Sequence, residues 1–475
     1  MTNVKSLLKN DSKSYSILTS ASEMAENMDL EVYVVGGYVR DIIIGNNLSD
    51  IDIMVVGDGI KYARKLVIKL DGNSIVPFEK FGTAQILLDD DMVEVSSARS
   101  ESYSINSRKP KIDSADLSTD LSRRDFTINA MAVSLNKSNF GELHDPYNGV
   151  RDLNRGIIQT PLDPDQTFSD DPLRMLRAIR FASQLAFKID PKIKESIKKH
   201  TQRIDIISAE RITAEIFKIL DSDVPSEGFD LLNEVGLMAI ILPEISALFG
   251  LEQPPEWHHK DIFYHTLQVV DNISKNTNKT NLRFAALLHD IGKPITRCLD
   301  KKRGWTFHGH DAVGANMIDR LARRMKLSKE TRDYLKKLTL LHLRPIALAK
   351  EEITDSAVRR LLVSAGDEIE DLMTLCRADI TSKNPKLVKK YLGNFDRVDR
   401  LMRDVTERDA YSAFQSPIRG AQIMEECNLA PGKIVGEIKN AIEEAILDGE
   451  IDNNYESAYE YFLKIKVSFL KNNDT

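Results

Sequence analysis

Residues 33–56 constrain the fold of this chain more than any other stretch. The segment reads YVVGGYVRDIIIGNNLSDIDIMVV, which is an apolar run, two glycines, a short helical piece, a turn and a second apolar run. The second run carries Asp50 and Asp52, and alternate residues of a strand point to the same face. Two carboxylates held side by side repel one another unless a cation lies between them. The segment therefore predicts a strand–helix–strand unit that binds a cation.

The residue types in this unit indicate which cation and which substrate to expect. Mg²⁺ prefers a few carboxylate ligands together with substrate phosphates. Gly36 and Gly37 leave bare backbone N–H groups that can donate to phosphate oxygens. A later strand, MVEVSSAR, carries Glu94, which is either a third carboxylate of this site or a solvated edge residue. Glycine pairs and Asp-x-Asp pairs are common elsewhere, but their order within one unit favours metal-assisted phosphoryl chemistry on a nucleotide.

A second charged stretch, LSRRDFTINAMAVSL, covers residues 121–135. Asp125 is a candidate N-cap, and the apolar residues that follow it predict a helix. Arg123 and Arg124 are then expected at the N-terminal edge of this helix. Arginine forks bind phosphate through paired hydrogen bonds, although two adjacent arginines are usually just a solvated pair.

A third stretch, DDPLRMLRAIRFA at residues 170–182, predicts a helix that begins at Asp170, because proline suits the first helical turn. Residues three apart share a helix face. Donor and acceptor groups held together on such a face can read the edge of a base, whereas an ordinary amphipathic helix with salt bridges would show the same spacing. The face carries one carboxylate and three arginines, namely Asp171, Arg174, Arg177 and Arg180.

Taken together, these strings resemble the motifs of the class II tRNA nucleotidyltransferases (CCA-adding enzymes) and the bacterial poly(A) polymerases. GGYVRD and LSDIDIMV are similar to the nucleotidyltransferase signature, RRDFTINAMA to a second family motif, and DDPLRMLRAIRFA to the base-selecting motif. Asp170 stands where glutamate is usual in one branch. The resemblance implies that Asp50 and Asp52 hold Mg²⁺ and that Asp171 and Arg174 read the base. It also implies nucleotide contacts by Gly36, Gly37, Arg40, Arg123, Arg124, Arg177 and Arg180.

A second constellation lies further along, because seven of the nine histidines fall between residues 258 and 342. Imidazole and carboxylate ligands suit divalent transition metals. The string LLHDIGKP and the order His, His-Asp, His, late Asp resemble an HD-domain phosphohydrolase, which implies a further metal site. A lone histidine is more often a packed core residue than a ligand, but five or six in this order are not easily explained in that way. The implied ligands are His265, His289, Asp290, His310 and Asp379, with His342 as a weaker candidate, and Lys293 is a candidate phosphate contact.

The length and composition of the chain indicate its domain number and its general class. With 475 residues the chain is too long for one core, so about two to four domains are expected. A hydrophobic content of 42% and a charged content of 29% are typical of soluble globular proteins. The net charge of −7 argues against nonspecific coating of nucleic acid but is compatible with a local basic stripe. Three scattered cysteines, no long apolar run and no signal-peptide pattern predict a cytoplasmic protein without a membrane span.

We therefore expect an α/β nucleotidyltransferase head with a mixed sheet, followed by an all-α neck, an HD-type helical body and a helical tail. ISAERITAEIFKILDS, residues 207–222, resembles the family's neck motif around Glu210, Arg211 and Glu215, and the resemblance implies that this segment supports the base-selecting helix. The tail resembles the module that ends many of these enzymes and is expected to bind tRNA. The expected domains are residues 1–150, 151–225, 226–400 and 401–475.

The resemblance predicts addition of C, C and A to tRNA 3′ ends from CTP and ATP, with tRNA as partner, no membrane and no protein partner implied. Mg²⁺ is expected in the head and a divalent transition metal of unknown identity in the HD domain, which is a further candidate hydrolase. Two alternatives share the same motifs: a poly(A) polymerase, or an enzyme that adds only CC or only A. An HD phosphohydrolase with an inert head is the alternative from another class.

Overall fold

The computed structural model describes residues 3–46, 50–89, 91–104, 107–251, 261–302, 304–350, 354–382, 384–409 and 417–471. The chain divides into two compact units, Met1–Ser246 and Ala247–Thr475. Residues 47–49, which belong to the turn predicted before Asp50, lie outside the described residues. Among the helices that the structure describes, none combines the length and the hydrophobicity needed to cross a membrane.

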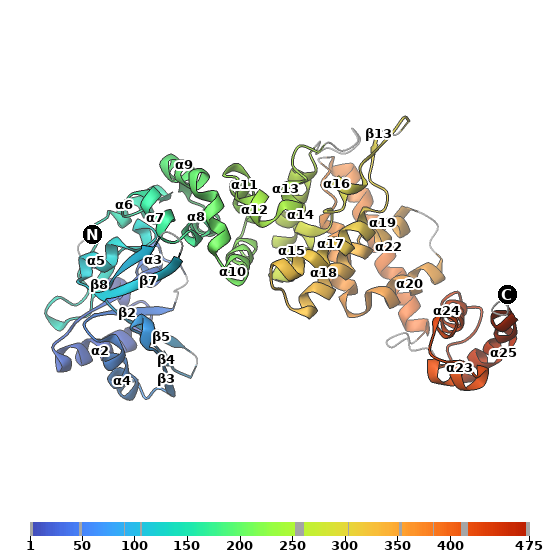
Figure 1. Cartoon of the computed structure of the whole chain (residues 1–475), viewed down its shortest axis with the longest axis horizontal. Coiled ribbons are helices and arrows are strands. Elements are labelled where there is room, and N and C mark those ends of the chain that lie inside the picture. The colour runs from blue at the N-terminus through green and yellow to red at the C-terminus, as the bar shows by residue number, and fades with distance from the viewer. Residues whose placement is uncertain are drawn as a thin grey trace. The chain divides into compact units, whose positions relative to one another are not determined.

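A seven-stranded mixed sheet forms the centre of the head (Figure 1), as the sequence predicts. Strand β2 lies near the middle, parallel to β5 and antiparallel to β1. In spatial order the strands are β3 Ser74–Phe78, β4 Thr83–Leu87, β5 Met92–Ser97, β2 Ile51–Val56, β1 Glu31–Val35, β8 Ala132–Ser134 and β9 Leu143–His144.

The two faces of this sheet bury different sets of side chains. Helices α2 (Ser12–Met28) and α4 (Gly59–Lys69) contact each other and the strands. On the opposite face, Tyr33, Val35 and Met54 pack against Leu121 of α5 (Leu117–Ser122). Because Val35 of β1 pairs with Asp52 of β2, Asp52 lies on the α5 face of the sheet.

The helix predicted after Asp125 does not form. Residues 127–129 make one turn of 3-10 helix (η2, Thr127–Asn129), and strand β8 follows at Ala132–Ser134. Ile128, Met131 and Val133 are all fully buried. A run that is buried on every side has no periodicity to separate strand from helix. Arg123 consequently caps the C-terminal end of α5 instead of lying at the N-terminus of a new helix.

The base-selecting segment is helical but starts later than predicted. A short helix that the sequence did not reveal, α7 (Pro164–Asp170), ends at Asp170, and α8 (Leu173–Leu185) begins after Pro172. Helix α8 packs against α10 (Ala209–Leu220) and α11 (Pro225–Glu234), which belong to the expected neck and its boundary. The first compact unit continues beyond residue 225, to Ser246.

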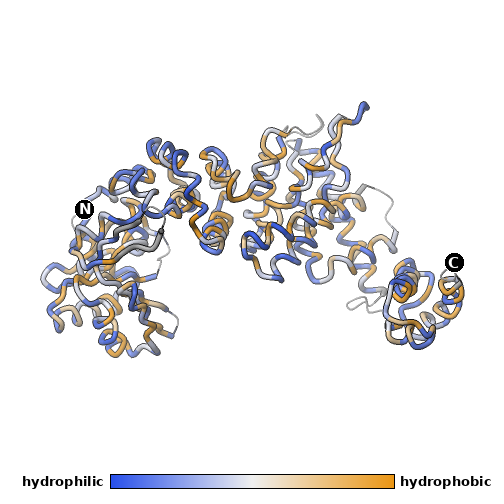
Figure 2. The backbone as a smooth tube through the Cα atoms, in the orientation of Figure 1, coloured by the Kyte–Doolittle hydropathy of each residue, from blue (hydrophilic) through white to orange (hydrophobic). Residues whose placement is uncertain are grey.

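The second unit is helical apart from one small hairpin among its described residues. Figure 2 shows hydrophobic and hydrophilic residues alternating along these helices, the pattern of amphipathic helices that share a core. Helix α22 (Pro385–Asp409) runs continuously through position 400, where a domain boundary was expected. The tail helices α23 (Gly420–Cys427), α24 (Lys433–Leu447) and α25 (Tyr455–Lys471) build a hydrophobic cluster of their own, around Ile423, Ile438 and Phe462.

Candidate active sites

Two carboxylates of the head lie directly opposite each other on neighbouring strands. Asp52 of β2 and Glu94 of β5 are register partners in the parallel pair. Partners on adjacent strands lie about 4.8 Å apart and share a face. Asp50 is exposed and lies two residues before Asp52, just outside β2. Of the two interpretations of Glu94, the register therefore favours a third carboxylate of the site.

The surroundings of Asp52 disfavour its charged form. Its pKa is raised to about 6, first by burial and then by the charge of Glu94, while Arg124 lowers it and Asp50 raises it further. A carboxylate that is hard to ionise in the protein alone is one that a bound cation would stabilise. A Cβ at Gly36 would lie 3.3 Å from Asp52 Oδ2 and 3.2 Å from Arg124 Nη1. The backbone of Gly36, the carboxylate of Asp52 and the guanidinium of Arg124 therefore lie next to one another.

A buried aspartate, Asp120, holds the two adjacent arginines in place. Its side chain is fully buried and accepts from Nη2 of Arg123 at 2.5 Å and from Nη2 of Arg124 at 3.0 Å. Arg123 also donates to Glu101 at 2.8 Å. Sequence reasoning missed Asp120, although its spacing of three and four residues from the arginines on one helical turn was a usable signal.

Arg40 is directed into the protein. Its guanidinium pairs with both carboxylate oxygens of Asp41, at 2.8 and 2.9 Å, and donates to Asn129 Oδ1 at 2.9 Å. It also lies over the Phe181 ring, 5.1 Å from the ring centroid. These contacts tie α3 (Gly37–Ile44) to η2 and α8, so the structure gives Arg40 a positioning role and does not bring it to the carboxylates.

The polar stripe of α8 connects to the head through its arginines. Arg174 Nη2 donates to the backbone oxygen of Arg123 at 2.7 Å, and Arg177 pairs with Asp125 at 2.6 Å. Burial alone would raise the pKa of Asp125, but the charge of Arg177 and a hydrogen bond from Asn129 lower it to about 2. Asp171 accepts from the Leu173 backbone N–H, which fixes its carboxylate at the start of α8.

Arg180 and Glu215 form a buried ion pair between α8 and α10, with Nη1 and Oε2 3.1 Å apart. Both side chains are only 6% exposed. Burial and the nearby Arg177 lower the pKa of Arg180 to about 10, against the opposing charge of Glu215. The neck segment that was predicted to support α8 therefore contacts it directly through Glu215, and this contact pairs the Arg180 charge inside the protein.

We expect Glu215→Gln to destabilise the first unit by about 3 kcal/mol, because it leaves the Arg180 charge buried without a counter-charge. Urea denaturation measures the change in the free energy of unfolding. Glu234→Gln is the control, since the Lys194–Glu234 pair is partly exposed and such pairs contribute about 0–1 kcal/mol. Equal effects of the two substitutions would contradict the structural role given to the buried pair.

In the second unit, every predicted ligand enters one cluster, including His342, which is only 2% exposed. His265 Nε2 lies 2.9 Å from Asp379 Oδ1, and His310 Nε2 lies 3.3 Å from His342 Nε2. The ligands come from the ends or interiors of α14 (Ile262–Ser274), α15 (Thr280–Leu288), α17 (His310–Arg324), α18 (Lys329–Leu341) and α21 (Ile369–Ala378). Helices distant in sequence therefore supply one site.

The Nδ1 atoms of these imidazole rings already make hydrogen bonds within the protein. Nδ1 of His289, His310 and His342 lies 2.7 Å from the backbone oxygens of Ala286, Phe307 and Thr339, respectively. A carbonyl only accepts, so each Nδ1 carries a proton, and Nε2 is the ring atom that faces the cluster and is left to bind a metal. His265 Nδ1 makes the equivalent contact with Thr381 Oγ1 at 3.0 Å.

The cluster fits a metal ion by its donors and its electrostatics. Nε2 of His289 is buried and makes no hydrogen bond. Burial would lower the pKa of His289, but the charges of Asp290 and Asp379 raise it to about 10, so the site attracts positive charge. Lys293 Nζ lies 2.6 Å from Asp290 Oδ2, which places an ammonium beside the cluster.

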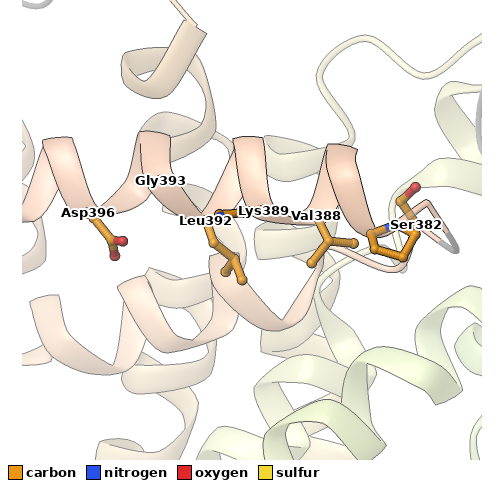
Figure 3. A pocket seen from close by; sticks show the side chains of 7 residues that line it. Ser382, Val388, Lys389, Leu392, Gly393 and Asp396 are labelled. Atoms are coloured by element: carbon orange, nitrogen blue, oxygen red, sulfur yellow. The ribbon is translucent and has the colours of Figure 1, made fainter.

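A separate groove follows the first turns of α22, where Val388, Lys389 and Leu392 line an open surface between Ser382 and Asp396 (Figure 3). Its lining is largely aliphatic and includes none of the predicted site residues. The groove is therefore separate from the buried histidine cluster.

Three family models match successive parts of the chain. Residues 32–159 match the poly A polymerase head domain, residues 186–249 a probable RNA- and SrmB-binding site of polymerase A, and residues 262–383 the HD domain. The Multifunctional CCA protein of Shewanella frigidimarina (strain NCIMB 400) is 34% identical over 319 residues, which are 64% of this chain and 72% of the relative. The chain belongs to the CCA-adding enzyme family.

Solved structures of this family have the same fold. The apo form II of a CCA-adding enzyme superposes with a TM-score of 0.65 at 23% identity, covering 97% of this chain and 98% of that one. A tRNA nucleotidyltransferase in complex with a primer tRNA and an incoming ATP analog gives a TM-score of 0.58 at 25% identity, covering 80% and 99%. The α/β head and the helical HD body are therefore those of CCA-adding enzymes, and the HD body carries two groups of candidate metal ligands.

Proposed function

We propose that this chain adds C, C and A to the 3′ ends of tRNA, using CTP and ATP and releasing pyrophosphate. The observation that carries the proposal is the register pairing of Asp52 with Glu94, beside Gly36 and Arg124. The nucleotidyltransferase head and the relatives that are CCA-adding enzymes support it.

Asp50, Asp52 and Glu94 provide the oxygen ligands that Mg²⁺ prefers. Bound there, Mg²⁺ would supply activation of the primer hydroxyl and stabilisation of the leaving pyrophosphate. The protein contributes the orientation. Gly37 brings a backbone N–H group to the start of α3, where a phosphate oxygen can accept from it, whereas the Gly36 N–H donates to the Met131 backbone oxygen at 3.4 Å. Arg124, which Asp120 holds beside Asp52, adds positive charge for the triphosphate.

One extension experiment separates the proposal from its rivals. The purified chain is incubated with a tRNA transcript that lacks CCA, with CTP alone, ATP alone or both, and the products are resolved to single nucleotides. We expect three added residues with both nucleotides. Long A-tracts would identify a poly(A) polymerase, a stop after CC or addition of A alone would identify a partial enzyme, and no extension would indicate an inert head.

Base selection is assigned to Asp171 and Arg174 at the start of α8, with Arg123 joined to Arg174 through its backbone oxygen. We expect Arg174→Lys to reduce the preference for CTP over UTP by about 10- to 100-fold, since a lysine keeps the charge but loses the planar fork. Single-nucleotide incorporation with each NTP measures the ratio. An unchanged ratio would remove Arg174 from base selection.

A second activity is favoured by the histidine cluster, which has the donor set of a metal-dependent phosphohydrolase. We propose that the second unit hydrolyses phosphate esters, including 2′,3′-cyclic phosphates at damaged tRNA ends, with a divalent transition metal of the kind that imidazole ligands prefer. The ammonium of Lys293, beside Asp290, is placed to pair with a substrate phosphate.

Asp290→Asn is expected to reduce the opening of 2′,3′-cyclic AMP to its monophosphate by at least about 100-fold while CCA addition continues, because metal-ligand carboxylates supply charge that an amide lacks. The 2′- or 3′-AMP formed is measured with nickel or manganese present. Asp52→Asn is the matched control. It should lose CCA addition and keep the hydrolysis of 2′,3′-cyclic AMP. Loss of hydrolysis in both variants would mean that the head is responsible for it.

Binding of tRNA is assigned in part to residues 401–475. The tail helices have their own core, so deleting residues 417–471 should leave the remainder folded. We expect this truncation to weaken tRNA binding in a filter assay while hydrolysis of a mononucleotide ester is retained. Unaltered tRNA affinity would remove the tail from the binding surface.

A further inference from the structure

We infer that Arg297, stacked on Trp305, binds the second phosphate of an RNA 3′ end whose terminal phosphate reaches the histidine cluster. The inference rests on the proposed phosphohydrolase function and deepens it, because it names the substrate class: the end of an oligonucleotide in preference to a mononucleotide. Neither residue belongs to the cluster of candidate metal ligands.

The two residues lie on a short segment that joins two parts of the cluster. Helix α16 (Lys293–Thr296) follows Asp290, and strands β12 (Cys298–Asp300) and β13 (Gly304–Thr306) pair as a hairpin before His310. Figure 1 shows β13 protruding from the helices of the second unit. Because Asp290 and His310 are both cluster residues, the segment is anchored at the cluster by its two ends.

Two cation–aromatic pairs lead from the cluster onto this hairpin. Lys293, which contacts Asp290, lies 5.7 Å from the centroid of the Phe307 ring. The guanidinium carbon of Arg297 lies 3.7 Å from the centroid of the Trp305 ring, well within the range of a cation–π contact. The two cations are four residues apart, and the two rings are two residues apart, so each set shares one side of its backbone. Arg297 therefore extends the positive charge of Lys293 outward from the cluster.

Arg297 lacks a counter-charge within the described part of the chain. Its Nε is buried and makes no hydrogen bond, and its guanidinium has neither an acceptor nor a carboxylate partner among the described residues. A guanidinium that stacks on an aromatic ring keeps its N–H groups in its own plane, where they can donate to phosphate oxygens. We therefore expect the missing acceptor to come from a ligand.

The surroundings of the stack are exposed and basic. Ile295 and Leu299, which lie two residues to either side of Arg297, are each 63% exposed. Lys301 and Lys302 at the turn of the hairpin are exposed as well. Proteins that bind single-stranded nucleic acid combine cations along the phosphate backbone with aromatic rings. The hairpin has this combination beside a candidate phosphohydrolase site.

The spacing of the two cations favours a chain end over a single nucleotide. Side chains one helical turn apart have Cβ atoms about 5–6 Å apart, a separation comparable to that of successive phosphates along an RNA strand. A terminal phosphate beside Lys293 thus brings the preceding phosphodiester close to Arg297. A mononucleotide carries only the first of these phosphates and gains nothing from Arg297.

The fluorescence of Trp305 tests the contact without relying on activity. Trp257→Phe leaves Trp305 as the one tryptophan of the full chain. In chelator, this chain is titrated with the dinucleotide ApA ending in a 3′-phosphate and with 3′-AMP, which lacks the second phosphate. We expect the dinucleotide to change the emission at a concentration at least about 10-fold lower than 3′-AMP requires. Equal concentrations, or no change with either ligand, would overturn the inference.

Matched variants assign the difference to one side chain. Arg297→Gln should weaken dinucleotide binding by about 10- to 100-fold and leave 3′-AMP binding unchanged, because hydrogen bonds between charged groups have effects of this size. Arg323→Gln is the control, since it removes the same charge from an exposed arginine about 20 Å along α17 from His310. Loss of dinucleotide affinity in both variants, or in neither, would contradict the role given to Arg297.

Kinetics separate this inference from the hydrolase function on which it rests. With Mn²⁺ present, the parent chain should open a 2′,3′-cyclic phosphate at the end of ApA with a KM at least about 10-fold below that for 2′,3′-cyclic AMP. Arg297→Gln should remove this advantage in KM while kcat stays the same. Dinucleotide binding at Arg297 without hydrolysis of either substrate would overturn only the hydrolase function. Hydrolysis of both substrates with equal KM would overturn only the inference.

Discussion

Asp52→Asn is expected to lower nucleotide incorporation into tRNA by about 10³-fold or more while leaving tRNA affinity unchanged. The reason is that Asp52 lies opposite Glu94 in the register and is partly buried, unlike the exposed Asp50, so an amide there removes charge from the centre of the metal site. Single-turnover incorporation of CTP measures the rate. Asp58→Asn is the control, because Asp58 only caps α4 and asparagine caps as well as aspartate.

The same substitution has an opposite effect on stability. Because the pKa of Asp52 in the folded protein is raised to about 6, its ionisation weakens the fold as the pH rises from about 4 to about 6, and the loss persists above that range. In chelator at pH 8, Asp52→Asn should therefore be more stable than the parent by roughly 1–3 kcal/mol. A variant that keeps its incorporation rate, or that is less stable in chelator, would contradict the assignment of Asp52 as a metal ligand.

Gly36→Ala is expected to reduce incorporation by about 100-fold, because displacing a reacting constellation by about 1 Å has effects of this size. Gly36 has φ 72° and ψ −134°, a conformation that is essentially restricted to glycine, and an added Cβ would press on Asp52 and Arg124. Steady-state extension of tRNA lacking CCA measures the loss.

Gly366→Ala separates backbone strain from the effect on the site. Gly366 ends α20 (Asp355–Ala365) with φ 57° and ψ −132°, close to the values of Gly36, but the nearest atom to an added Cβ is a Glu368 carboxylate oxygen 3.9 Å away. Both alanines should destabilise the chain by about 1–3 kcal/mol, and only Gly36→Ala should lose incorporation. Equal losses of incorporation would mean that strain alone explains the effect.

Local patterns predicted the parts of the site that lie close together in sequence. The glycine pair, the helix after it and the strand with Asp52 follow from residues 33–56 alone. Glu94 could not be assigned in the same way, because strand order and register decide which residue of β5 meets Asp52. The stretch after Asp125 was wrongly predicted to be helical. Its residues are buried on all sides, so the sequence shows no alternation of polar and apolar residues that would separate a helix from a strand.

The arginines show a different limit of sequence reasoning. Repeated spacing identified Arg174, Arg177 and Arg180 as one stripe, but spacing does not reveal which of them is paired within the protein. The structure buries Arg180 against Glu215 and pairs Arg40 with Asp41, so the charges of both arginines are compensated within the protein. His342, which sequence order ranked below the other ligands, is fully part of the cluster, since neighbours in space need not follow a family's usual order.

The way in which the imidazoles are oriented affects how the second unit can tolerate mutation. His289, His310 and His342 each donate to the carbonyl three residues earlier, so the acceptor belongs to the main chain whatever side chain stands at Ala286, Phe307 or Thr339. Sequence drift at those three positions can continue without rotating the rings, provided that the backbone path is kept. His265 instead contacts the hydroxyl of Thr381, and this ligand is therefore the one that a single neighbouring substitution can release.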